Sequence, residues 1–278
     1  MDTTFVIITG ASKGIGRSIA LSFAQHSEIK KLHLCLMARS QDGLNETSRL
    51  ILDKKEHSPM MCTKEIVVTT HPIDLSHLDS LEESIVDIFK QCYEPYLDQY
   101  THCILINNAG TLGHLGQAIS LPSPKDLMQN VELNLASSCW LSSYFIRDFH
   151  LTSLYRQNKK CTVVNMSSLC AISPFETMAM YCAGKAYRDM YHQTMALEQL
   201  KRSDDIKILN YAPGAIATDM TDTLRNCHDL DPELQTFFNS RDENKFVKVE
   251  DSTSKLVQLV LSGNFESGKH IDYWDDIE

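Results

Sequence analysis

Short apolar runs recur along the chain, with longer segments of mixed polarity between them. The runs are near-continuous rather than alternating, and they cover residues 5–9, 32–37, 66–70, 103–106, 162–165 and 206–209. A strand that is covered on both faces of a sheet has this pattern, because neither of its faces meets water. We therefore predict that these runs are buried strands.

The segments between the runs have helical spacing. Leu78, Leu81, Ile85 and Phe89 follow one another at intervals of three and four residues, and residues 15–24 hold a similar apolar face. Alternation of strand and helix is typical of an α/β protein. We predict a Rossmann-like, doubly wound parallel sheet of about seven strands with helices on both faces.

No linker rich in Pro, Gly or Ser interrupts this alternation, so we expect residues 1–278 to form one domain. The least regular part is the polar segment 222–250, which contains Asp231-Pro232. We expect this segment to be a mobile flap or a short helical insert on the substrate side.

Composition and charge argue against several classes of binding partner and several locations for this protein. The formal net charge is −10, which repels a phosphate backbone and argues against a nucleic-acid partner. Nine cysteines without a Cys-x-x-Cys pair suit reduced thiols in the cytosol, and we predict no metal site. The first residues do not resemble a signal peptide, and no apolar run reaches about 18 residues, so we expect a cytoplasmic protein without a membrane span.

The first predicted strand runs directly into Thr9-Gly10-Ala11-Ser12-Lys13-Gly14-Ile15-Gly16, and an amphipathic segment follows. Glycines let such a turn approach a pyrophosphate, which then lies at the positive end of the helix. The alternative interpretation is a tight strand-to-helix turn without a ligand. The position of the motif between strand and helix favours a dinucleotide site.

The second predicted strand ends at Arg39, and no acidic residue lies between Glu28 and Asp42 to bind a ribose hydroxyl. Together with Lys13 and Arg17, Arg39 offers positive charge to a 2′-phosphate. Each cation alone is more often a solvated surface residue. Their joint placement favours NADP(H).

Polar residues also follow the third and fourth strands, at Asp74-Leu75 and at 107–110, which reads Asn-Asn-Ala-Gly. Ligands of doubly wound sheets bind at such strand ends. The alternative is that the two Asn side chains only form hydrogen bonds with the backbone of the loop.

A candidate reaction centre follows the fifth strand. Tyr181 and Lys185 are four residues apart and share one face of a helix, where a nearby ammonium lowers the pKa of a phenol. Tyr181 could then give a proton to a carbonyl oxygen while Ser168 donates a hydrogen bond to the same oxygen. A Tyr-Lys pair on a solvated helix surface is the commonplace alternative.

These motifs, in this order, resemble the short-chain dehydrogenase/reductase family, and Asn-Asn-Ala-Gly and the late Pro213-Gly214 complete the pattern. The resemblance implies that Asn134 joins Ser168, Tyr181 and Lys185 as the fourth catalytic residue and holds a water against Lys185. By itself, Asn134 would rather be a helix cap or a buried polar group. The cofactor residues that motifs and resemblance imply are Gly10, Ser12, Lys13, Gly14, Ile15, Gly16, Arg17, Arg39, Ser40, Asp74, Leu75, Asn107, Ala109, Gly110, Lys185, Ile216, Thr218, Asp219 and Met220.

Within that family, the stretches 164–171, 181–186, 210–214 and 267–272 are similar to members that reduce pterins. The resemblance implies NADPH-dependent reduction of pterin side-chain carbonyls, in the closing steps of tetrahydrobiopterin synthesis, by a cytosolic homodimer. A carboxylate can accept hydrogen bonds from both the 2-amino group and the adjacent ring N–H of a pterin. By the resemblance, Asp272 matches the aspartate that anchors the pterin in these members of the family. A C-terminal surface acid is the plainer interpretation of Asp272. The expected substrate-binding residues are Ser168, Leu169, Tyr181, Gly214 and Asp272.

Three functions therefore remain open: a pterin carbonyl reductase, a general dicarbonyl or ketone reductase of the same family, and a non-catalytic NADPH sensor. A complete set of catalytic residues argues against the sensor. Residues 133–149 are apolar on more than one face, which indicates burial either within the domain or against a second subunit.

Overall fold

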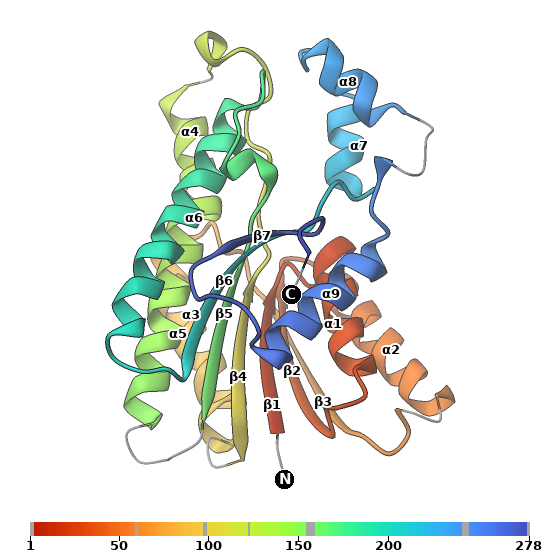
Figure 1. Cartoon of the computed structure of the whole chain (residues 1–278), viewed down its shortest axis with the longest axis vertical. Coiled ribbons are helices and arrows are strands. Elements are labelled where there is room, and N and C mark those ends of the chain that lie inside the picture. Colours follow the sequence, from red (N-terminus) through yellow and green to blue (C-terminus); the bar gives the residue numbers. More distant parts are fainter. Residues whose placement is uncertain are drawn as a thin grey trace.

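The predicted strands all form, and a seventh joins them (Figure 1). We describe a computed structural model that covers residues 3–58, 61–96, 99–121, 123–153, 159–240 and 245–276. The strands are β1 (Thr3–Thr9), β2 (Lys31–Ala38), β3 (Glu65–Pro72), β4 (Tyr100–Asn107), β5 (Lys160–Met166), β6 (Ile206–Ala212) and β7 (His270–Asp272). Each of the first six extends beyond its predicted apolar run, because flanking polar residues continue the backbone pairing.

Helices connect successive strands, as the periodicity predicts. They are α1 (Gly14–Gln25), α2 (Gln41–His57), α3 (Leu78–Cys92), α4 (Pro124–Val131), α5 (Ser137–Ser153), α6 (Ala179–Leu200), α7 (Asp219–Arg225), α8 (Pro232–Phe238) and α9 (Val249–Ser262). A π-helical turn, Glu132–Ala136, joins α4 to α5, and short 3-10 turns lie at Glu94–Tyr96, Ala118–Ser120 and Leu169–Ala171. None of the helices in these described ranges is both long and apolar enough to cross a membrane.

The strands lie in the order β3-β2-β1-β4-β5-β6-β7, and all neighbours are parallel. The order reverses between β1 and β4, so the loops that leave these two strands diverge to opposite faces of the sheet. A ligand site is expected at the carboxyl ends of the strands at such a switch point. The doubly wound fold predicted from the sequence is confirmed.

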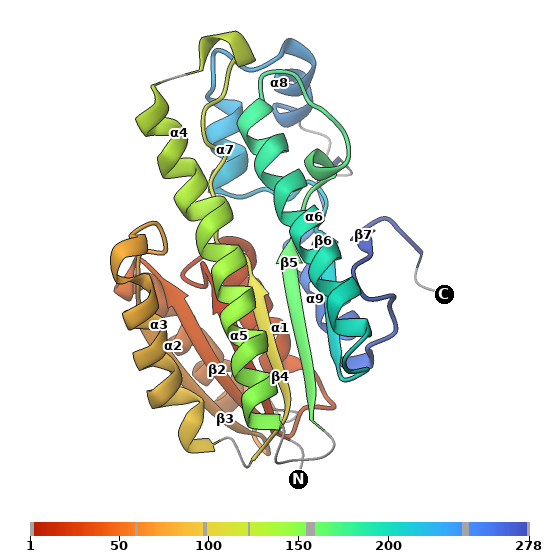
Figure 2. The same cartoon turned by 90° about the vertical axis from the view of Figure 1, so that its left-hand side faces the viewer.

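Helices cover both faces of the sheet (Figure 2). Side chains of α1, α2 and α9 pack on one face, and side chains of α3, α5 and α6 pack on the other. Strand β1 shows how the two cores divide: Val6 and Ile8 belong to the first, Phe5 and Ile7 to the second, and all four are at most 1% exposed. Burial on both faces explains why the apolar runs do not alternate.

The helix predicted to be apolar around its circumference is buried largely by its own chain. Leu141, Phe145 and Phe149 of α5 are at most 2% exposed and pack into the core beneath the sheet. Of the two interpretations left open, burial within the domain therefore accounts for this face of α5.

The segment 222–250 contains the end of α7, all of α8 and the first two residues of α9, joined by turns and irregular backbone, and residues 241–244 lie outside the described ranges. Leu224 and Leu230 are buried with Leu112 and Met178 in a small third cluster, beyond the carboxyl ends of the strands. Helices α7 and α8 rise above the sheet at that end (Figure 1). The cluster connects them to the loop after β4 and to the start of α6.

Candidate active site

The glycine turn after β1 brings strand and helix unusually close. Gly10 and Gly14 have φ angles of +67° and +54°, a conformation that favours glycine. A Cβ on Gly16 would lie 2.3 Å from the carbonyl oxygen of Gly10, so no larger residue fits there. Asn108 secures the turn from β4, because its Nδ2 donates to the carbonyl oxygens of Thr9 at 2.9 Å and Gly10 at 3.3 Å.

The start of α1 is suited to an anion. Its N-cap residue, Lys13, makes no side-chain capping bond, and its first turn holds no acidic residue. Uncapped backbone N–H groups and the helix dipole favour phosphate at such a position. The residues present therefore fit the pyrophosphate of a dinucleotide.

A cleft of about 560 Å³ runs along the carboxyl ends of the strands, past this turn. It contains Tyr181 and most of the predicted cofactor residues: Gly10, Ser12, Lys13, Gly14, Ile15, Arg39, Ser40, Asp74, Leu75, Ala109, Gly110, Lys185, Thr218, Asp219 and Met220. Asn108 and Pro213, which belong to motifs noted in the sequence, line it as well. Residues that the sequence did not indicate also line it, among them Ala38, Ile73, Leu133, Met166 and Ser167. Most of these are apolar residues at strand ends, which carry no chemical signal in a sequence.

Four predicted cofactor residues, Gly16, Arg17, Asn107 and Ile216, lie beside the described lining of the cleft rather than in it. Arg17 turns beneath the glycine turn, where its Nε donates to Thr47 Oγ1 at 3.0 Å and its guanidinium donates to the carbonyl of Ser12. Arg17 therefore stabilises the glycine turn through hydrogen bonds and does not line the cleft.

Two cations border the end of the cleft near β2. Arg39 is exposed, and Ser40 beside it caps α2 by accepting a hydrogen bond from Gly43 N at 3.1 Å. Lys13 forms an ion pair with Asp219, the first residue of α7, across the cleft. Binding of a phosphate by Lys13 would therefore require it to leave Asp219.

Tyr181 and Lys185 project from the first turns of α6 into the cleft. Lys185 Nζ lies 5.4 Å from the centre of the Tyr181 ring and donates to the carbonyl oxygen of Met166 at 2.6 Å. Burial, with a contribution from the positive charge of Arg188, lowers the pKa of Lys185 to about 7. The pair thus meets at the end of β5, as the helical spacing predicts.

The sequence-based expectation for the Tyr181 phenol is wrong in direction. Burial raises its pKa above the ordinary value of 10.0, and this effect outweighs the opposing contributions of Arg188 and of a hydrogen bond with Ser168. Tyr181 therefore keeps its proton at neutral pH. That state suits a group that donates a proton to a carbonyl oxygen.

Ser168 lies next to Tyr181, at the start of the turn Leu169–Ala171. Its Oγ accepts a hydrogen bond from Cys170 N at 3.2 Å, which fixes the hydroxyl. Leu169, the next residue, is 48% exposed and is outside the described lining of the cleft.

Asn134 lies in the π-helical turn and is 6% exposed. Its Oδ1 accepts from Thr111 N at 2.8 Å, and its Nδ2 donates to Thr111 O at 2.9 Å. The amide is therefore committed to the loop after β4. Because the amide is occupied, Asn134 would bind a water next to Lys185 through its main-chain carbonyl group.

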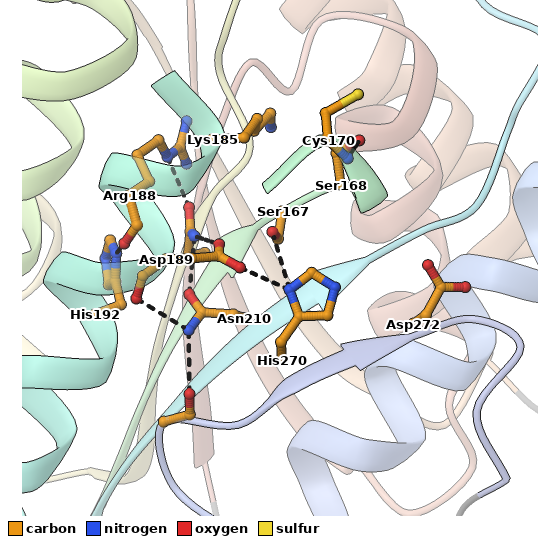
Figure 3. A network of polar contacts seen from close by, with 12 residues as sticks. Ser167, Ser168, Cys170, Lys185, Arg188, Asp189, His192, Asn210, His270 and Asp272 are labelled. Carbon is orange, nitrogen blue, oxygen red and sulfur yellow. Dashed lines mark hydrogen bonds and ion pairs between the residues drawn. The ribbon is translucent and has the colours of Figure 1, made fainter. Parts of the chain in front are cut away.

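Behind Lys185 lies a buried polar network that the sequence analysis missed (Figure 3). Arg188, 1% exposed, donates from Nε to Asn165 Oδ1 at 2.7 Å and from a terminal nitrogen to Asn107 O at 2.6 Å. Asp189, 2% exposed, accepts from Asn165 Nδ2 at 2.9 Å and lies 2.6 Å from His270 Nδ1. The network connects α6 with β4, β5 and β7.

A signal for this network exists in the sequence. Arg188 and Asp189 follow Lys185 by three and four residues, so all three side chains lie on the same face of α6. Asn165 pairs in register with Asn210, and Asn165 Nδ2 donates to Asn210 Oδ1 at 2.9 Å. Polar residues within two otherwise apolar strands need such partners.

Asp272 lies on β7, in register with Ala212, and is half-buried. Its Oδ1 accepts from Trp274 N at 3.0 Å. Gly214 has a φ of +79°, and a Cβ there would lie 3.7 Å from Trp274 Nε1. The C-terminal segment thus approaches the loop after β6, although Asp272 is outside the described lining of the cleft.

Comparison with known proteins agrees with this geometry. A family model described as short chain dehydrogenase matches residues 4–228. Sepiapterin reductase from Bos taurus is 32% identical over 279 residues, covering 99% of this chain and 96% of the bovine protein. Benzil reductase ((S)-benzoin forming) from Bacillus subtilis (strain 168) is 27% identical over 266 residues, covering 96% of each. A solved 7α-hydroxysteroid dehydrogenase, complexed with NADH and 7-oxo glycochenodeoxycholic acid, has a TM-score of 0.73 at 20% identity, covering 98% of this chain and 92% of that one.

Proposed function

The chain belongs to the short-chain dehydrogenase family, whose members are oxidoreductases, and we propose that it uses NADPH to reduce carbonyl groups on the side chains of pterins. The observation that carries the proposal is the meeting of Tyr181, Lys185 and Ser168 beside a dinucleotide-sized cleft. The likeness to the bovine sepiapterin reductase continues beyond residue 228, where the family model ends, and so includes the segment with Asp272.

The roles of the chain's own residues follow from their environment. A bound nicotinamide would supply the hydride to the carbonyl carbon. Tyr181, which burial keeps protonated, gives its phenolic proton to the carbonyl oxygen. Ser168 donates a hydrogen bond to the same oxygen and stabilises the charge that develops there. Lys185, fixed by the carbonyl of Met166, passes a proton toward Tyr181, and Asn134 holds a water for this relay.

The substrates that fit this proposal are sepiapterin, reduced to dihydrobiopterin, and 6-pyruvoyl-tetrahydropterin, reduced to tetrahydrobiopterin. Asp272 anchors the pterin ring, because a carboxylate matches the 2-amino group and the adjacent ring N–H. Leu169 and Gly214 border the side chain that carries the carbonyl group. The described part of the segment 222–250 covers the substrate as a flap.

The cofactor is NADPH rather than NADH. The end of β2 presents Arg39 where an NAD-binding protein usually has an acidic residue, and Lys13 lies across the same end of the cleft. A 2′-phosphate gives Lys13 a partner of greater charge than Asp219. Arg39 can bind it in a bidentate manner.

The active form is a cytosolic homodimer. Helix α6 exposes Tyr187 by 51% and Met190 by 62%, and these side chains border a hollow of about 880 Å³ that α5 completes. Exposed apolar surface of this kind favours a subunit interface, and a two-fold axis would bring the same helices of two copies together. No disulfide links cysteines in the part of the chain that the structure describes, which suits a reducing compartment.

A general diketone reductase is the second candidate. The likeness to a benzil reductase favours it, since the reaction centre fixes the chemistry and the pocket fixes the substrate. A non-catalytic NADPH sensor is the third, and such a protein would have no use for the Tyr181 environment described above.

The test is NADPH oxidation by the purified protein with sepiapterin and, separately, with benzil. A catalytic efficiency at least tenfold higher for sepiapterin supports the pterin function. The reverse order would support the diketone reductase. NADPH binding without turnover of either compound would leave only the sensor.

A further inference from the structure

Three side chains that bind metals meet on the face of the sheet covered by α3. They are Cys35 from β2, His71 from β3 and Cys92, the last residue of α3. One sulfur or nitrogen atom from each lies within 4.8 Å of the other two. His71 Nε2 and Cys92 Sγ are in direct contact at 3.0 Å. None of the three is among the described residues that line the cleft.

We propose that Cys35, His71 and Cys92 form a binding site for one zinc ion. Zinc takes thiolate sulfur at about 2.3 Å and imidazole nitrogen at about 2.0 to 2.1 Å in a tetrahedral arrangement. These bond lengths place neighbouring ligand atoms about 3.5 to 3.8 Å apart. The separations in the cluster reach this arrangement with side-chain shifts of about 1 Å or less.

The charge of this ligand set matches a buried divalent ion. Cys35 is 0% and Cys92 2% exposed, so a site with residual charge would carry a large desolvation cost. Two thiolates and one neutral imidazole balance the two positive charges of zinc. The two thiol protons leave to solvent as the metal binds.

Neighbouring groups hold the ligands in place. His33 precedes Cys35 by two residues on the same strand face, and its Nδ1 lies 2.6 Å from the Tyr100 hydroxyl. The Tyr100 hydroxyl donates to the Cys92 carbonyl at 3.0 Å, which fixes the backbone of that ligand. Metal ligands are commonly oriented by hydrogen bonds of this kind.

The fourth coordination position belongs to an oxygen atom. Thr69 is in register with Cys35 on the neighbouring strand, and its hydroxyl, which donates to the carbonyl oxygen of Leu34 at 3.4 Å, lies close to both cysteine thiols. Thr69 Oγ1 or a water held by it is the natural fourth ligand. The ion reaches the site along β3, which is an edge strand and carries the partly exposed His71.

The sequence did not suggest the site, because its ligands come from three separate elements and form no local motif.

The test uses the full chain, reduced with a phosphine, stripped with a chelator and titrated with Co²⁺ and Zn²⁺. We expect one equivalent of Co²⁺ to produce near-ultraviolet absorption from thiolate coordination, which Zn²⁺ then displaces. Cys92→Ser and His71→Gln should weaken zinc binding roughly 100-fold or more. Cys227→Ser and His57→Gln, whose positions are outside the cluster, should bind as the parent does.

Folding of each variant is verified by its NADPH binding, because the glycine turn that binds the cofactor lies elsewhere. His71→Gln keeps a polar side chain at a partly exposed position and serves if Cys92→Ser does not fold. Zinc should raise the unfolding midpoint of the parent and leave that of His71→Gln unchanged. Cobalt binding without a thiolate band, or equal zinc affinity in His71→Gln and the parent, would overturn the site.

Discussion

His270 Nδ1 lies 2.6 Å from Asp189 Oδ2, and this ion pair joins the last strand of the sheet to the helix that carries Tyr181 and Lys185. Asp189 follows Lys185 by four residues, and His270 precedes Asp272 by two. The proposed proton relay and the proposed pterin anchor are therefore connected through one buried contact (Figure 3).

The Asp189–His270 pair should make stability depend on pH. The hydrogen bond that His270 Nδ1 donates to the Asp189 carboxylate raises the pKa of His270 above 6.5. The stabilisation is therefore complete below about pH 6.5, and it is lost as the pH rises through the raised pKa of the folded state. We expect His270→Gln to lower the urea midpoint more at pH 6 than at pH 9.

The control for this prediction is His57→Gln, which changes an exposed histidine on α2. Its urea midpoint should differ from that of the parent by the same small amount at both pH values. A deficit of His270→Gln that is larger at pH 9 than at pH 6 would show that the pair does not gain stability from a charged imidazole.

Tyr181→Phe should lower turnover by about 100-fold or more, the range expected for loss of a general acid. NADPH affinity should stay within about twofold, because the phenol is proposed to act on the substrate oxygen. Steady-state kinetics and fluorescence titration measure the two quantities. Tyr96→Phe, at a position that is 42% exposed and outside the described lining of the cleft, is the matched control and should retain full activity.

The rate of carbonyl reduction should fall as the pH rises through about 7. Burial lowers the pKa of Lys185 to about 7, so its ammonium form, which supplies the proton relay, predominates only below that value. In the free enzyme, kcat/KM should then decline by about tenfold per pH unit above pH 7. Lys185→Met should show a low rate without this step, and a flat profile in the parent would contradict the role of Lys185.

Arg39→Asp should shift the preference from NADPH toward NADH. Loss of a charged hydrogen bond to phosphate costs about 1.5 to 3 kcal/mol, and this corresponds to a change of about 10- to 150-fold in the ratio of kcat/KM values. Lys30→Asp places the same charge change just before the opposite end of β2 and should leave the ratio unchanged. Equal ratios in Arg39→Asp and the parent would place the 2′-phosphate elsewhere.

Asp272→Ala should reduce kcat/KM for sepiapterin by at least tenfold while that for benzil changes by less than about threefold, because only the pterin offers paired N–H donors. Asp276→Ala, an exposed acid four residues later, is the control. Equal losses on both substrates would mean that Asp272 maintains the fold of the pocket rather than anchors the ring.

The fold and most of the cleft follow from local patterns in the sequence. Near-continuous apolar runs reveal buried strands, and the glycine turn and the Tyr181–Lys185 spacing each lie within one short segment. The pKa direction of Tyr181 could not be predicted, because the phenol's burial comes from segments far apart in the chain. The same reason hid the partners of His270, which a three-residue strand brings to α6.

The π-helical turn Glu132–Ala136 limits how this chain can change in length. A π-turn holds about one residue more than the α-helix around it, and one residue corresponds to a rotation of about 100°. A single deletion there would turn Leu141 and Phe145 away from the sheet and remove the Asn134 amide from Thr111. An insertion or a deletion within this turn would therefore disturb the core of the domain and the loop after β4 at the same time.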